Sequence, residues 1–149
     1  MTKRQRIYEK CDGRCAYTGK PITRHNFQID HVQPCLRERP TKYETPEERI
    51  IRLERYKRKN TDDNLLPCLP IVNHYKRGNG LEGFRKLIST LHVRIAKLHK
   101  KNGDIRKGQE KRVKYLKEVA EAFGITSFTP FVGEFWFELE QCINGDKIL

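Results

Sequence analysis

Two apolar stripes at helical spacing run through the second half of this 149-residue chain. The first stripe consists of Phe84, Leu87, Ile88, Leu91, Ile95 and Leu98. The second consists of Val113, Leu116, Val119, Ala120 and Phe123. Steps of three and four residues place each set on one face of a helix. We therefore predict an antiparallel helix pair with a shared core, in which the segment 102–104 ends the first helix and Asp104 caps the second.

The first half of the chain predicts shorter elements. Residues 3–10 are expected to form a basic helix, and Phe27–Val32 a short strand or hairpin arm that ends at Pro34. Thr45-Pro46 followed by two glutamates predicts a helix over 46–59, with Ile50, Leu53 and Tyr56 on one side. Residues 71–77 predict another short helix, which the glycines at 78 and 80 stop. Leu65, Leu66 and Leu69 lie among prolines, and the sequence predicts only that they are apolar anchors.

The charge balance predicts a polyanionic partner. The chain has 31 Lys and Arg against 19 Asp and Glu, a net charge of +12, and residues 81–123 hold twelve basic but only five acidic side chains. This excess favours nucleic acid as the partner. No apolar run approaches the roughly 20 residues of a membrane span, and no apolar segment of a signal peptide follows the basic N-terminus. We expect a cytoplasmic protein that does not enter a membrane.

The cysteines do not predict a disulfide scaffold. There are five, an odd number, at positions 11, 15, 35, 68 and 142, and their spacing forms no framework. Cys11 and Cys15 are expected to be small, partly buried thiols.

Three short segments carry side chains suited to phosphodiester hydrolysis. Such a reaction needs an activated water and charge neutralisation at the phosphate. A neutral imidazole such as that of His31 is a suitable base near pH 7, and Asp30 and Asn73 can each give Mg²⁺ an oxygen. Neighbours on a strand point in different directions, so Asp30 can hold a metal while His31 reaches water. Lys76 lies three residues after Asn73, on the same helix face, where it or Arg77 can hold the phosphate.

These residues and their spacing resemble the HNH nucleases, whose ββα-metal module is a hairpin followed by a helix around one divalent ion. The resemblance covers residues 11–80. It consists of a turn with Cys15, the pair Asp30-His31 before Pro34, Asn64-Leu65, Asn73 nine residues after Asn64, and Lys76 three residues further on. 

The resemblance implies a role for each of these residues. Asp30 and Asn73 bind the metal, which is Mg²⁺, Mn²⁺ or another divalent ion. His31 is the general base, and Asn64 braces the loop between the strands and orients His31. Asn73 stands where the family's motif has its last histidine, a variant that is common in the family and keeps an oxygen ligand.

One departure concerns zinc. Many small HNH nucleases bind a structural zinc through two Cys-x-x-Cys pairs, whose matching positions here are Cys15, Thr18, Leu69 and Val72. Because only one of the four is a cysteine, no structural zinc is expected. In this respect the module is more similar to the zinc-free HNH domain of CRISPR effector nucleases.

Together these observations predict an α+β fold in a single domain over residues 1–149. A ββα-metal core spans 11–80 with an inserted helix near 46–59, and a helical extension with an aromatic tail spans 81–149; the tail, near 131–138, is expected to be a strand or a packed extended segment.

The expected function is that of a divalent-metal-dependent DNA endonuclease, with phosphate contacts from Lys76, Arg77, Arg85 and Lys86. The alternatives are a catalytically inactive HNH-fold DNA-binding module and an accessory protein of a phage or mobile-element machine. The compact form resembles HNH proteins of phages and mobile elements, so the expected compartment is a bacterial or phage-infected cell. The sequence does not predict the cleavage specificity, the choice between DNA and RNA as the substrate, or the oligomeric state.

Overall fold

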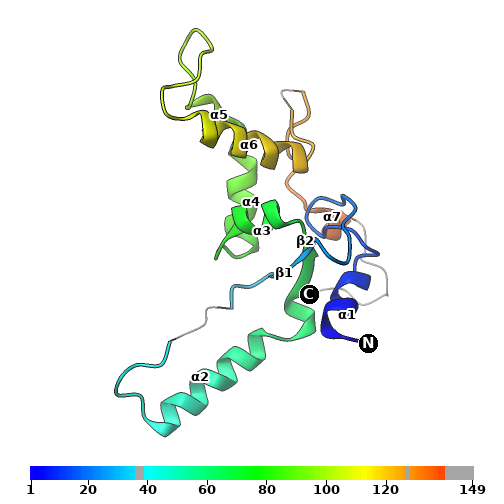
Figure 1. Ribbon diagram of the computed structural model, residues 1–149, viewed down its shortest axis with the longest axis vertical. Coiled ribbons are helices and arrows are strands. Elements are labelled where there is room, and N and C mark those ends of the chain that lie inside the picture. The colour runs from blue at the N-terminus through cyan, green and yellow to red at the C-terminus, as the bar shows by residue number, and fades with distance from the viewer. Residues whose placement is uncertain (36–38, 127, 140–149) are drawn as a thin grey trace.

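The computed structural model describes residues 1–35, 39–126 and 128–139 (Figure 1). Its elements are α1 (Lys3–Glu9), β1 (Gln28–His31), α2 (Pro46–Lys59), the 3₁₀ turn η1 (Asp62–Asn64), β2 (Leu65–Cys68), α3 (Pro70–Lys76), α4 (Leu81–Ser89), α5 (Leu91–Ala96), α6 (Glu110–Ala122) and α7 (Trp136–Leu139). The predicted α+β class is confirmed. None of the helices in these ranges has the length and apolar character needed to cross a bilayer.

Two antiparallel strands and the helix that follows them lie at the centre of the molecule. In the register of β1 with β2, Asp30 lies opposite Leu66 and His31 opposite Leu65, and α3 begins two residues after β2 ends. All four residues of β2 are buried. A strand buried on both faces shows no polar alternation, which explains why its sequence indicates apolar anchors but no strand.

Helix α2 is inserted between the two strands, with the bounds that the sequence predicts. The Thr45 hydroxyl accepts a hydrogen bond from the backbone N–H of Glu48, whose side chain accepts in return from the Thr45 N–H. The helix extends away from the rest of the molecule as an arm (Figure 1). It buries no residue, and Ile50 is 57% exposed, so its apolar side packs on no core in the described chain.

The helical extension differs from the predicted pair. Residues 84–98 form no single helix, because α4 and α5 meet at Thr90, where φ is −100° and ψ is 6°. The Thr90 hydroxyl donates to the Lys86 carbonyl at 2.9 Å, a local bond that competes with the helical ladder. Helix α6 begins at Glu110 after Gln109, so the prediction that Asp104 caps it is wrong. Helices α5 and α6 nevertheless pack together.

The aromatic tail packs on the residues that precede β1. Phe135 and Phe137 are buried, and α7 forms where a strand was one of two expectations. The backbone N–H of Trp136 donates to the Tyr17 carbonyl at 3.2 Å, and that of Phe137 to the Ala16 carbonyl at 2.8 Å. The tail is thereby fixed both to the helical extension and to the turn that leads into β1.

Candidate active site

A pocket of about 220 Å³ lies between β1 and the end of α3. Its lining consists of Ile29, Asp30, His31, Pro34, Cys35, Asn73, Arg77 and Gly78. Four of the predicted site residues therefore meet there: Asp30, His31, Asn73 and Arg77. The other four, Asn64, Lys76, Arg85 and Lys86, do not line it.

Asp30 is a buried carboxylate held by two partners. It is 5% exposed, in the middle of β1. The hydroxyl of Tyr17 donates to Oδ2 at 2.5 Å, and the Lys76 ammonium lies 3.0 Å from Oδ2 and 3.3 Å from Oδ1. A charged side chain is rarely buried unless it is paired, and Lys76 provides the neutralising charge here.

Lys76, which is expected to hold the substrate phosphate, is buried. Its side chain is 1% exposed, and its ammonium also donates to the His31 carbonyl at 2.7 Å. The last turn of α3 packs on β1, so this cation points into the protein beneath the strand. Lys76 is a structural partner of Asp30, and its contact with a phosphate stays a prediction.

The ring of His31 is oriented by Asn60, which ends α2. The distance from His31 Nε2 to Asn60 Oδ1 is 3.2 Å. Because an amide oxygen only accepts, Nε2 is the donor in this bond, and the neutral form of the ring then has its lone pair on Nδ1. Lys3 of α1 in turn donates to the Asn60 carbonyl at 3.2 Å. Sequence reasoning missed Asn60, whose only signal is an amide residue at the predicted helix end just before the motif residue Asn64.

Asn64 braces the connection between the two strands. Its Oδ1 accepts from the Gln33 N–H at 2.8 Å, and its Nδ2 donates to the carbonyls of Gln33 at 3.0 Å and Lys59 at 2.7 Å. The Asn64 carbonyl also accepts from the Val32 N–H at 3.0 Å. Asn64 therefore acts on the backbone that follows His31, while the His31 ring is held by Asn60.

We expect Asn64→Ala to lower the free energy of unfolding by about 1–2 kcal/mol, because three backbone groups lose their hydrogen-bond partner. Urea denaturation measures this change. Asn102→Ala is the matched control, since Asn102 is exposed and bonds only within its own turn; its effect should stay within about 0.5 kcal/mol. Equal effects of the two substitutions would show that Asn64 is no brace.

Asn73 and Asp30 are the residues that fit a hard divalent ion. Asn73 Nδ2 donates to Gln28 Oε1 at 2.7 Å, and within the described ranges its Oδ1 accepts no hydrogen bond. A carboxylate oxygen keeps lone pairs beyond those that its present bonds use. No group of three or more His, Cys, Asp or Glu side chains gathers in the part of the chain that the structure describes. One carboxylate and one amide oxygen fit Mg²⁺, which keeps several waters, better than an ion that needs a full protein shell.

Arg77 lies at the rim of the pocket in a strained conformation. It is exposed, and its φ of 53° and ψ of −134° are unusual for a residue with a side chain. Its backbone N–H donates to the Asn73 carbonyl at 3.0 Å. Strain of this kind is often found at functional sites, and the expected phosphate contact of Arg77 stays a prediction.

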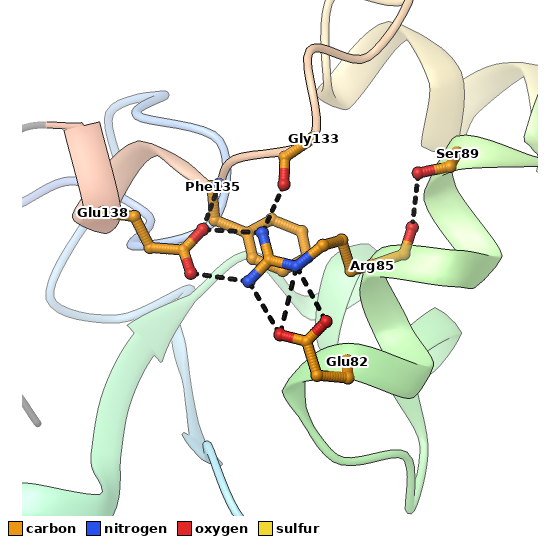
Figure 2. Close-up of polar contacts among 6 residues, drawn as sticks. All are labelled: Glu82, Arg85, Ser89, Gly133, Phe135 and Glu138. Carbon is orange, nitrogen blue, oxygen red and sulfur yellow. Dashed lines mark hydrogen bonds and ion pairs between the residues drawn. The ribbon is translucent and has the colours of Figure 1, made fainter.

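Arg85 holds the tail, and its phosphate contact stays a prediction. Figure 2 shows its guanidinium between Glu82 and Glu138: Nη1 and Nη2 donate to the Glu138 carboxylate at 2.8 and 2.6 Å. It also donates to the Gly133 carbonyl. The bond to Arg85 lowers the pKa of Glu138, which keeps this pair charged. Lys86, the next residue of α4, is exposed, and its phosphate contact stays a prediction.

Two buried groups near Asp30, the Tyr17 phenol and the Cys68 thiol, have a raised pKa. Burial, followed by the charge of Asp30, raises the pKa of Tyr17 well above its ordinary value and also raises that of the Cys68 thiol. Tyr17 thus keeps the proton that it donates to Asp30. Cys15, Cys35 and Cys68 are free thiols; Cys142 lies outside the described ranges.

Comparison with known proteins adds little. No family model matches the chain, and no curated protein matches it. Among solved structures it is similar to the Type II-C Cas9 enzyme from Actinomyces naeslundii, with 18% sequence identity and a TM-score of 0.41. That similarity covers 84% of this chain and 11% of the Cas9 chain. A likeness this weak supports no conclusion, so the fold and the site rest on the elements and contacts described above.

Proposed function

We propose that this protein is a divalent-metal-dependent DNA endonuclease of the HNH type. The observation that carries the proposal is that Asp30, His31 and Asn73, the residues of the HNH-like motif, line one pocket with Arg77 at its rim. An imidazole with a free Nδ1 lone pair stands there beside two hard oxygen ligands. 

The proposed reaction is hydrolysis of a phosphodiester. His31 Nδ1 takes a proton from water, the resulting hydroxide bonds to phosphorus, and the bond from phosphorus to the 3′ oxygen breaks. The 3′ oxygen then takes a proton from solvent. Asp30 and Asn73 would hold a divalent ion, which would supply positive charge at the phosphate oxygens. Asn60 keeps the ring in the tautomer that has Nδ1 free, and Arg77 holds the phosphate at the rim.

The choice of a nucleic acid as the partner follows from charge. The net charge of +12 attracts a phosphate backbone, and Arg77 at the pocket rim and Lys86 on α4 are both exposed cations. The proposed location is the cytoplasm of a bacterial or phage-infected cell, where such a substrate is available.

A plasmid assay tests the proposal. Supercoiled DNA should become nicked or linear in the presence of Mg²⁺ or Mn²⁺ and stay intact with a chelator, because charge neutralisation at the phosphate needs the ion. DNA affinity, measured by fluorescence anisotropy at two salt concentrations, should fall as salt rises. A labelled single-stranded RNA in parallel shows whether the substrate is RNA instead.

Two outcomes contradict the nuclease. Salt-sensitive DNA binding without cleavage at any metal concentration would identify an inactive HNH-fold binding module. A protein with no DNA affinity that co-purifies with a stable protein partner would identify an accessory component of a larger machine.

A further inference from the structure

Tyr17 connects the active site with the aromatic tail. Its side chain is 1% exposed, and its hydroxyl donates to Asp30 Oδ2 at 2.5 Å. Oδ2 is also the oxygen nearer to Lys76, at 3.0 Å. Both close contacts thus fall on one carboxylate oxygen, which leaves Oδ1, 3.3 Å from Lys76, as the less occupied oxygen of Asp30.

The ring of Tyr17 is held by three phenylalanines in edge-on contact. Its centroid lies 5.3 Å from that of Phe84, 5.2 Å from Phe135 and 5.8 Å from Phe137, at interplanar angles of 88°, 89° and 90°. Such T-shaped pairs are the favoured geometry of aromatic rings. Two of the three rings, together with the N–H that Trp136 donates to the Tyr17 carbonyl, come from the tail. 

The tail is in turn fixed to α4 by Arg85. The paired bonds from Arg85 to Glu138 form a fork-to-fork contact, and the guanidinium lies 5.0 Å from the centroid of the Phe135 ring. Glu138 also accepts from the Phe135 N–H at 2.7 Å. Figure 2 shows that this one carboxylate ties the cation of α4 to the backbone of the residue that packs on Tyr17.

We propose that the tail, residues 131–139, is a positioning element of the active site. It fixes the ring of Tyr17, and the Tyr17 hydroxyl fixes the Asp30 carboxylate with Oδ1 available to a divalent ion. Without that hydroxyl the carboxylate is free to rotate, and Oδ1 can move closer to Lys76 and away from the ion. This inference rests on the proposed function, since it gives Asp30 the role of a metal ligand.

Tyr17→Phe tests the link to Asp30, because it keeps the ring and removes the hydroxyl. We expect the Kd for Mn²⁺, measured by calorimetry on the full chain without DNA, to rise by about 10-fold or more, as is typical when a partner of a metal ligand is lost. A fold that merely loosens would lower Tm without changing the Kd. An unchanged Kd in Tyr17→Phe would overturn the inference.

Glu138→Ala tests the link to the tail, and Glu82→Ala is its matched control. Both glutamates contact Arg85, but Glu82 is an exposed neighbour on α4, with a side chain 81% exposed, and holds no part of the tail. We expect Glu138→Ala to raise the Kd for Mn²⁺ severalfold and Glu82→Ala to leave it unchanged. Equal shifts would show that the tail does not act on the site.

Combining the two substitutions shows whether the tail acts through Tyr17. In the Tyr17→Phe protein, Glu138→Ala should lower Tm but raise the Kd no further, because the connection is already broken. Independent, multiplying effects on the Kd would overturn the inference. If the wild-type protein binds Mn²⁺ but cuts no DNA, the proposed nuclease function is contradicted and the positioning role of the tail is not. Absence of Mn²⁺ binding in the wild type contradicts both proposals.

Discussion

His31→Ala should lower the rate of DNA cleavage by about 10²–10⁴-fold, the usual contribution of a positioned general base, while DNA affinity stays nearly unchanged. The reason is that the ring accepts the proton of the attacking water but contributes little to holding the phosphate backbone, which the exposed cations attract. Single-turnover cleavage at saturating Mg²⁺ gives the rate, and fluorescence anisotropy gives the affinity.

His92→Ala is the control for this prediction. His92 lies exposed on α5, outside the pocket lining, so its loss should leave both rate and affinity as in the wild type. Similar cleavage rates for the two variants would exclude His31 as the base. Loss of DNA binding together with cleavage in His31→Ala alone would instead assign His31 to substrate binding.

The parts of the fold that the sequence predicts are those with local signals. Helix α2 has its predicted bounds because Thr45, Pro46 and Glu48 specify its start within four residues. Strand β2 pairs with β1 across more than thirty residues, and no local pattern indicates that pairing. The sequence also does not predict the break at Thr90, because apolar residues continue at steps of three and four residues on both sides of it.

The same distinction applies to the site. The motif names Asp30, His31 and Asn73, which line one pocket, but it does not say which cations are already paired. Lys76 and Arg85 bind carboxylates 46 and 53 residues away, so their charge is used within the protein. Asn60 and Tyr17 are missed because their contacts also join distant parts of the sequence. Asn60 contacts His31 across 29 residues, and Tyr17 contacts Asp30 across 13.

The buried pair of Lys76 and Asp30 leads to the largest expected loss of stability. Lys76→Ala leaves the carboxylate of Asp30 buried without a counter-charge, and breaking such a pair costs about 3–5 kcal/mol. For a chain of this size that corresponds to a fall in Tm of roughly 10 °C. Urea denaturation at pH 7 measures the free energy. Lys86→Ala, which removes an exposed lysine of α4, should change it by less than about 0.5 kcal/mol.

The origin of that cost can be separated from lost packing. Because the loss comes from an uncompensated charge, the double variant Lys76→Met with Asp30→Asn should recover a large part of the stability: it removes both charges, keeps side chains of similar size and leaves an amide that still accepts from Tyr17. If the double variant is as unstable as Lys76→Ala, the cost lies in packing around the lysine stem. If Lys76→Ala is as stable as Lys86→Ala, the pair contributes nothing to the fold.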